Sequence, residues 1–142
     1  MVDQVKKYEF IDHTADLGIE VYGSDLKGLF QNAGEALFEI ICDPSELTES
    51  IEKRVAVDGE DLDQLMVVWL GELLYLHDTE RLLLKRFEVE EIGERRLVAT
   101  VYGEELKEGY HSIKTEIKAV TYHQIQVRQE EGRWIARVIF DL

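Results

Sequence analysis

The sequence contains only one cysteine, Cys42, and one proline in 142 residues. A single thiol cannot form a disulfide within the chain, so we expect a core-stabilised protein in a reducing, cytoplasmic setting. The apolar residues before Cys42 favour a buried small hydrophobe over a nucleophile. The chain also lacks the roughly 18 consecutive apolar residues of a membrane span. Its charged N-terminal segment does not have the pattern of a secretory signal. We therefore expect a soluble protein.

Basic residues are also scarce. There are 16 Lys and Arg residues against 30 Asp and Glu residues, which gives a formal net charge of −14. Because affinity for nucleic acid depends on neutralising phosphates with Lys and Arg, tight direct binding to RNA or DNA is not expected. Glycine-rich phosphate loops, Cys-x-x-Cys pairs and His-Glu-x-x-His helices are absent from the sequence. The acidic surface suits cations and basic protein partners, or serves only to keep the protein soluble.

Two segments have apolar residues at helical spacing. The first follows Ser24, the expected N-cap, and ends before Asp43-Pro44; the second runs from Asp61 to His77-Asp78. Alternating patterns predict about seven strands, near residues 7–11, 17–21, 51–57, 82–92, 97–101, 117–127 and 134–140. Residues 45–50 are predicted to form a polar surface loop. Residues 103–113 are predicted to form an unusually long loop, a kind that is often functional. The sequence therefore predicts one α+β domain, residues 1–142, with a two-layer arrangement of a mainly antiparallel sheet and two long helices.

Asp12, His13 and Asp16 lie close together between the first two predicted strands. Carboxylate oxygens and an imidazole at this density suit a cation site or a general acid/base site. The same stretch also suits a turn in which Asp12 and Asp16 bond to their own backbone. At the other end of the chain, Asp141 precedes Leu142, whose terminal carboxylate adds further hard oxygen donors.

Other polar residues also stand out against the apolar pattern. His77 lies on the apolar stripe of the second helix, where a histidine with a satisfied core role is the simpler interpretation. Asp78, at the predicted helix end, suits either a ligand or a solvated terminal residue. Lys118 and His123 belong to the strand predicted near residue 120.

The sequence resembles the archease family, the small acidic protein partners of RtcB-type RNA ligases. The resemblance depends on residues 10–18 (FIDHTADLG), 76–78 (LHD), 117–123 (IKAVTYH) and 134–142 (WIARVIFDL). These motifs occur in the family's order and extend over essentially the whole chain. Residues 103–113 carry no family signature.

The resemblance implies that the protein is not itself an enzyme. It implies an activator that accelerates guanylylation of the ligase histidine, supports multiple turnover in tRNA splicing and can broaden the nucleotide that the ligase accepts. It also implies a divalent metal held by Asp16, Asp141 and Leu142, with Lys118, Asp16 and Asp141 needed for activation. Asp12, His13 and His123 are candidates for supporting these ligands. Ligation by carboxylates alone favours calcium, or else magnesium or manganese, over zinc.

Two other functional classes are compatible with the residues. The first is a metal-dependent hydrolase in which Asp12, Asp16 and His123 hold a catalytic ion, which would turn over a small substrate without a partner. The second is a general acidic chaperone or binding module, which would suppress aggregation of unrelated proteins.

Overall fold

The computed structural model describes residues 6–11 and 16–142. Within these ranges the chain forms two α-helices, one short 3-10 helix and eight strands. Their bounds are β1 (Tyr8–Ile11), β2 (Leu17–Gly23), α1 (Leu26–Ile41), η1 (Pro44–Glu46), β3 (Ile51–Asp58), α2 (Leu62–Glu80), β4 (Leu82–Ile92), β5 (Arg96–Glu105), β6 (Ala119–Val120), β7 (Gln126–Glu130) and β8 (Arg133–Asp141). The predicted α+β class and the two long helices are confirmed.

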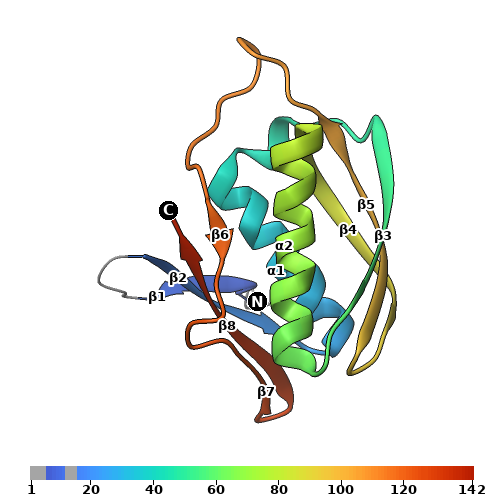
Figure 1. The fold of residues 1–142 in the computed structure, drawn as a ribbon, viewed down its shortest axis with the longest axis vertical. Helices are drawn as coiled ribbons and strands as arrows, with labels where there is room; N and C mark the ends of the chain where they lie inside the picture. Colours follow the sequence, from blue (N-terminus) through green and yellow to red (C-terminus); the bar gives the residue numbers. More distant parts are fainter. Residues whose placement is uncertain (1–5, 12–15) are drawn as a thin grey trace, which may run out of the picture.

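The strands divide into two antiparallel sheets rather than one. The first sheet has the order β1-β2-β8-β6, and β7 pairs with β8 beside β6. The second sheet has the order β3-β5-β4. The strand that is last in sequence therefore lies in the interior of the first sheet, between β2 on one side and β6 and β7 on the other (Figure 1).

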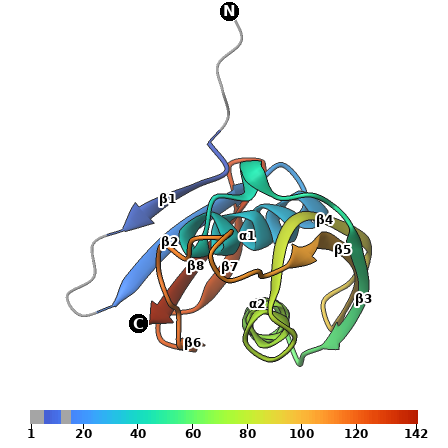
Figure 2. The same cartoon turned by 90° about the horizontal axis from the view of Figure 1, so that it is seen from above.

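The helices occupy the space between the two sheets. Helix α1 packs on β2 of the first sheet and on β4 of the second, and α2 contacts strands of both sheets (Figure 2). Trp69 of α2 is fully buried, and its indole N–H donates to the carbonyl oxygen of Phe30 in α1 at 2.9 Å. The shared core thus joins both helices. No helix within residues 6–11 and 16–142 is long and apolar enough to cross a membrane.

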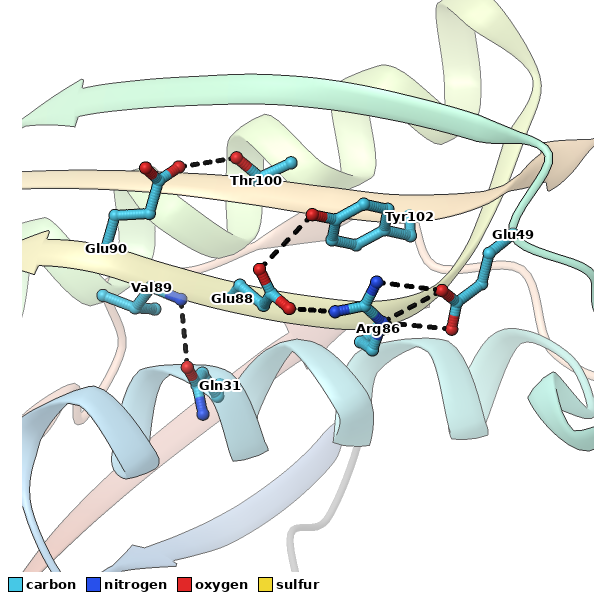
Figure 3. A network of polar contacts seen from close by, with 8 residues as sticks. All are labelled: Gln31, Glu49, Arg86, Glu88, Val89, Glu90, Thr100 and Tyr102. Carbon is cyan, nitrogen blue, oxygen red and sulfur yellow. Dashed lines mark hydrogen bonds and ion pairs between the residues drawn. The ribbon is translucent and has the colours of Figure 1, made fainter.

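The face of the second sheet turned away from the helices carries a polar network (Figure 3). The Arg86 guanidinium pairs with the carboxylates of Glu49 and Glu88 and lies 3.8 Å from the ring centroid of Tyr102. These contacts are exposed, so this face is a solvated sheet surface. At the edge of this sheet, the side chain of Gln31 in α1 accepts a hydrogen bond from the backbone N–H of Val89 in β4 at 3.0 Å.

Helix α1 begins one residue later than the sequence indicated. Its N-cap is Asp25, not Ser24, because the Asp25 carboxylate accepts the backbone N–H of Gly28 at 2.7 Å. Both residue types are good N-caps, and only the backbone conformation selects between them. The helix ends at Ile41, and Asp43-Pro44 starts the short 3-10 helix η1 as the proline requires. Residues 45–50 are not wholly surface loop, since Leu47 is buried.

Helix α2 begins as predicted, with Asp61 accepting the backbone N–H of Gln64 at 2.8 Å. It continues past His77-Asp78 to Glu80, so the predicted end is wrong. The cap is Arg81, whose backbone is left-handed at φ 56° and whose N–H bonds to the Leu76 carbonyl. Glycine is the usual residue in such a cap, and an arginine there carries no stop signal.

The long loop is displaced relative to its predicted range. Strand β5 continues through Gly103 to Glu105, and a methyl group at Gly103 would lie 1.9 Å from the Leu83 carbonyl oxygen of β4. The loop instead occupies residues 106–118, and it passes over the C-terminal end of α2 (Figure 1). We call it the 106–118 loop. The strand predicted near residues 117–127 is not continuous: it contains the two residues of β6, and its last two residues belong to β7.

Candidate functional site

Three segments that are distant in sequence meet at the C-terminal end of β8. Leu17 of β2 pairs with Phe140, which places Asp16 beside this end of the strand. On the opposite side, Ala119 of β6 pairs with Asp141, and the Lys118 N–H donates to the Asp141 carbonyl oxygen at 2.8 Å. Adjacent strands lie about 5 Å apart, so these residues are neighbours. We call Asp16, Lys118, Asp141 and Leu142 the β8-end cluster.

The cluster is open to solvent. Asp16 is half-buried, Lys118 and Asp141 are exposed, and Leu142 keeps 45% of its surface. The Lys118 ammonium forms no hydrogen bond or ion pair with any residue that the structure describes. An accessible ammonium can contact a phosphate or a carboxylate of a partner.

The oxygen donors of the cluster fit a hard cation. Asp16, Asp141 and the carboxylate of Leu142 offer oxygen only, which is the ligand type that calcium prefers. Among the described side chains, no three from His, Cys, Asp and Glu gather closely enough to hold a metal. The third ligand that the family resemblance implies, the carboxylate of Leu142, is not one of these side-chain types.

Three residues, Asp12, His13 and His123, are expected to support the ligands. Asp12 and His13 lie outside the described residues. His123 is exposed in the turn after β6, where its N–H donates to the Thr121 hydroxyl at 3.3 Å. The Thr121 N–H in turn donates to the Ile139 carbonyl at 3.0 Å, two residues before Asp141. His123 is thus set back along β8 from the cluster.

Lys118 also lines a pocket of about 640 Å³ between the end of α2 and the 106–118 loop. We call it the Lys118 pocket. Its wall on the α2 side contains His77, Asp78 and Arg81, and the loop contributes Glu108, Gly109, His111, Ile113 and Glu116. The long loop and His77 stand out in the sequence, whereas Arg81 and His111 do not. The left-handed backbone of Arg81 has no sequence signal, although such conformations often occur at functional sites.

The structure shows His77 in the core role that the sequence favours, and it also places the residue in the lining of the pocket. Its Nδ1 lies 3.0 Å from the Leu82 carbonyl oxygen, which can only accept, so Nδ1 carries the proton of the neutral ring. The ring edge also packs on Phe38, with centroids 6.0 Å apart. His77 is therefore a half-buried residue whose Nδ1 has a hydrogen-bond partner, and it lines the pocket. Asp78 is an exposed residue inside the last turn of α2.

Cys42 has no part in the cluster. It is buried, its thiol lies 3.3 Å from the Phe38 carbonyl oxygen, and burial raises its pKa to about 11. A thiol that stays protonated is a poor nucleophile. The predicted burial of Cys42 is confirmed.

Comparison with known proteins decides the family. The model of the archease protein family matches residues 8–142. The chain belongs to the archease family. Protein archease of Methanothermobacter thermautotrophicus is 44% identical over 97% of this chain and 100% of its own. Protein archease of Pyrococcus abyssi is 39% identical over the same shares of the two chains.

Solved archease structures have the same fold. The solution structure of a Methanobacterium thermoautotrophicum protein superposes with a TM-score of 0.84 at 43% identity, over 97% of this chain and all of the other. The crystal structure of an archease from Thermotoga maritima, described as a possible chaperone, has a TM-score of 0.65 at 24% identity over both full chains. At that identity the second likeness shows the fold alone. The resemblance inferred from the motifs is confirmed.

Proposed function

We propose that this archease activates an RtcB-type tRNA-splicing RNA ligase through the β8-end cluster. The supporting observation is the meeting of Asp16, Lys118 and Asp141 at one end of β8. The family resemblance independently implies a role in activation for the same three residues. Their proximity in an accessible place is what a contact site for a protein partner requires.

The proposed mechanism is electrostatic. Guanylylation transfers a nucleotide onto the ligase histidine, and positioning and charge stabilisation dominate such reactions. Asp16, Asp141 and the Leu142 carboxylate are proposed to hold a divalent cation, calcium first, with magnesium or manganese as alternatives. The bound cation would neutralise negative charge on phosphate oxygens. Lys118 would bind a phosphate or a ligase carboxylate and so orient the two proteins.

The direct test is guanylylation of the ligase with and without this protein. Asp16→Ala and Asp141→Ala should each return the rate to that of the ligase alone, while circular dichroism shows an intact fold, because accessible carboxylates contribute little to the core. Asp58→Ala is the matched control, since Asp58 is an exposed carboxylate of the second sheet that pairs with Arg96. Full stimulation by a folded Asp16→Ala protein would remove Asp16 from the site.

The remaining functional classes give different outcomes in the same experiments. A hydrolase would turn over small phosphorylated or acylated substrates without the ligase. A general chaperone would suppress aggregation of unrelated proteins and would leave the guanylylation rate unchanged. We also propose that the protein acts in the cytoplasm and does not bind tRNA tightly by itself, because its net charge of −14 opposes phosphate binding. Titration with tRNA at low salt tests the second point.

A further inference from the structure

Glu104, near the end of β5, is buried with 6% of its surface exposed, and it is the one charged residue so buried in the part of the chain that the structure describes. One carboxylate oxygen accepts the backbone N–H of Thr48 at 2.6 Å. The other lies 3.2 Å from Nε2 of His111, whose side chain is 5% exposed. An ionised carboxylate presents an unprotonated oxygen at each of these two contacts. In agreement, these contacts, led by the Thr48 N–H, hold the pKa of Glu104 below its usual range.

The His111 ring has a defined tautomer. Its Nδ1 accepts the backbone N–H of Lys107 at 2.9 Å, so in the neutral ring the proton is on Nε2 and faces Glu104. The contact between Nε2 and Glu104 is close but not aligned as a hydrogen bond, and no other acceptor among the described residues serves Nε2. The negative charge of Glu104 therefore offsets part of the free-energy cost of burying this N–H.

The pair fixes a segment that has few other attachments. Leu106 donates to the Arg81 carbonyl at 2.7 Å, and Lys114 donates to the Ile41 carbonyl at 2.7 Å. Between these two anchors, the backbone hydrogen bonds of residues 107–113 to other described residues stay inside the segment, where Tyr110 and His111 both donate to the Lys107 carbonyl. Ile113 packs against the core as an apolar anchor. The ion pair of Glu108 with Arg81 is exposed and adds little constraint, so the contact with Glu104 is the main polar link from residues 107–113 to the sheet.

The same segment forms the wall of the Lys118 pocket that faces α2. His111 lines that pocket, as do Glu108, Gly109 and Ile113. We propose that Glu104 and His111 are positioning residues for partner binding: they hold residues 107–113 in place so that the Lys118 pocket can receive a segment of the ligase. This inference rests on the proposed function, because it assigns the ligase contact to a pocket adjoining the β8-end cluster.

The inference makes a specific kinetic claim. If the wall is released, the partner must order residues 107–113 when it binds, and this entropy cost weakens association. Lys118, Asp16 and Asp141 are unchanged, so the rate at saturation should persist. The protein concentration that gives half-maximal stimulation should therefore rise, whereas the maximal guanylylation rate should not fall.

The experiment uses Glu104→Gln and His111→Gln, with Glu105→Gln as the control. The glutamine at position 104 has nearly the same shape but one acceptor and one donor, so it cannot serve both neighbours. Glu105 is the next residue and is exposed. Amide exchange by NMR on the isolated protein reports the 107–113 segment, and titration of guanylylation against protein concentration reports binding. All assays are run well below the measured unfolding midpoints.

In both test variants we expect amide exchange at residues 107–113 to rise roughly tenfold or more and the half-maximal concentration to rise roughly tenfold. For Glu104→Gln, whose side chain does not line the Lys118 pocket, the maximal rate should stay within about twofold of wild type, and the control should match wild type in all respects. Unchanged exchange overturns the inference, because the pair then holds nothing. Faster exchange with an unchanged titration curve overturns it too, because the wall then has no role in binding. A wild-type protein that fails to stimulate the ligase instead overturns the proposed function and its partner.

Discussion

The backbone N–H of Lys118 donates to the carbonyl oxygen of Asp141 at 2.8 Å. This single bond joins the last residue of the 106–118 loop to the last residue of β8. It uses backbone atoms of both residues, so the ammonium and the carboxylate remain available. Substitution of either side chain can therefore test its chemistry without removing the bond that positions it.

Lys118→Ala should reduce ligase activation more than it reduces cation binding. An ammonium cannot ligate a cation, but it can pair with a phosphate or a partner carboxylate. Calorimetry with calcium or manganese, set beside the guanylylation rate, separates the two effects. Lys27→Ala, which removes an exposed lysine of α1, is the control. Equal loss of cation affinity and activation would mean that Lys118 braces the carboxylates by neutralising them.

Amidation of the Leu142 carboxylate should weaken both cation binding and activation. The change removes one charge and one hard oxygen ligand and adds almost no bulk. Circular dichroism should be unchanged because Phe140, which anchors the end of β8, stays buried. An amidated protein that binds calcium and stimulates guanylylation normally would show that the terminal carboxylate is not a ligand.

Gly103→Ala should destabilise the fold by about 1–3 kcal/mol or more, because the new methyl group would overlap the Leu83 carbonyl. The overlap is with backbone atoms of β4 rather than with a flexible side chain, so its relief requires β4 and β5 to separate. Gly93→Ala in the β4–β5 turn is the matched control, because a methyl group there meets nothing within 4 Å. Urea unfolding of both variants measures the difference. Equal stabilities would mean that β4 and β5 can separate at Gly103 without cost.

The stability contribution of Glu104 should depend on pH. Its pKa is lower in the folded protein than its ordinary value of 4.5, so the folded state favours the ionised form. This contribution is present above the ordinary value and is lost as the pH falls through the folded pKa. The difference in unfolding free energy between wild type and Glu104→Gln should thus be largest near neutral pH and shrink as the pH falls below the ordinary value of 4.5. A difference that stays constant over this range would show that ionisation of Glu104 is not linked to folding.

Much of the fold could be predicted because local signals were strong. Asp61 and the apolar spacing after it define the start of α2, and Asp43-Pro44 defines the end of α1. The end of α2 could not be predicted, since the tertiary structure holds Arg81 in a left-handed conformation that the residue type does not indicate. Likewise Gly103 suggests a loop by its type, whereas in the fold it permits close approach of two strands.

The candidate residues could be named from the motifs, and the resemblance implied a metal shared by Asp16 and Asp141, but the strand register that brings Lys118 to the same place could not be predicted. Whether Asp16 and Lys118 flank the same strand end depends on the register of two strand pairs with β8, and no local pattern encodes it. The Glu104–His111 contact was missed for a different reason. A buried carboxylate in a chain with 30 acidic residues has no compositional signal.

The interior position of β8 has a consequence for biosynthesis. A ribosome makes β8 after every other strand, yet β2, β6 and β7 all pair with it. Until β8 emerges, the edge of β2 that pairs with β8 in the folded protein stays unpaired. Unpaired strand edges favour aggregation. Closure then joins segments more than a hundred residues apart in sequence, a step of high contact order that is intrinsically slow. The β8-end cluster can form only once this last strand is inserted. A product truncated before β8 would therefore lack both the cluster and the central strand of the first sheet.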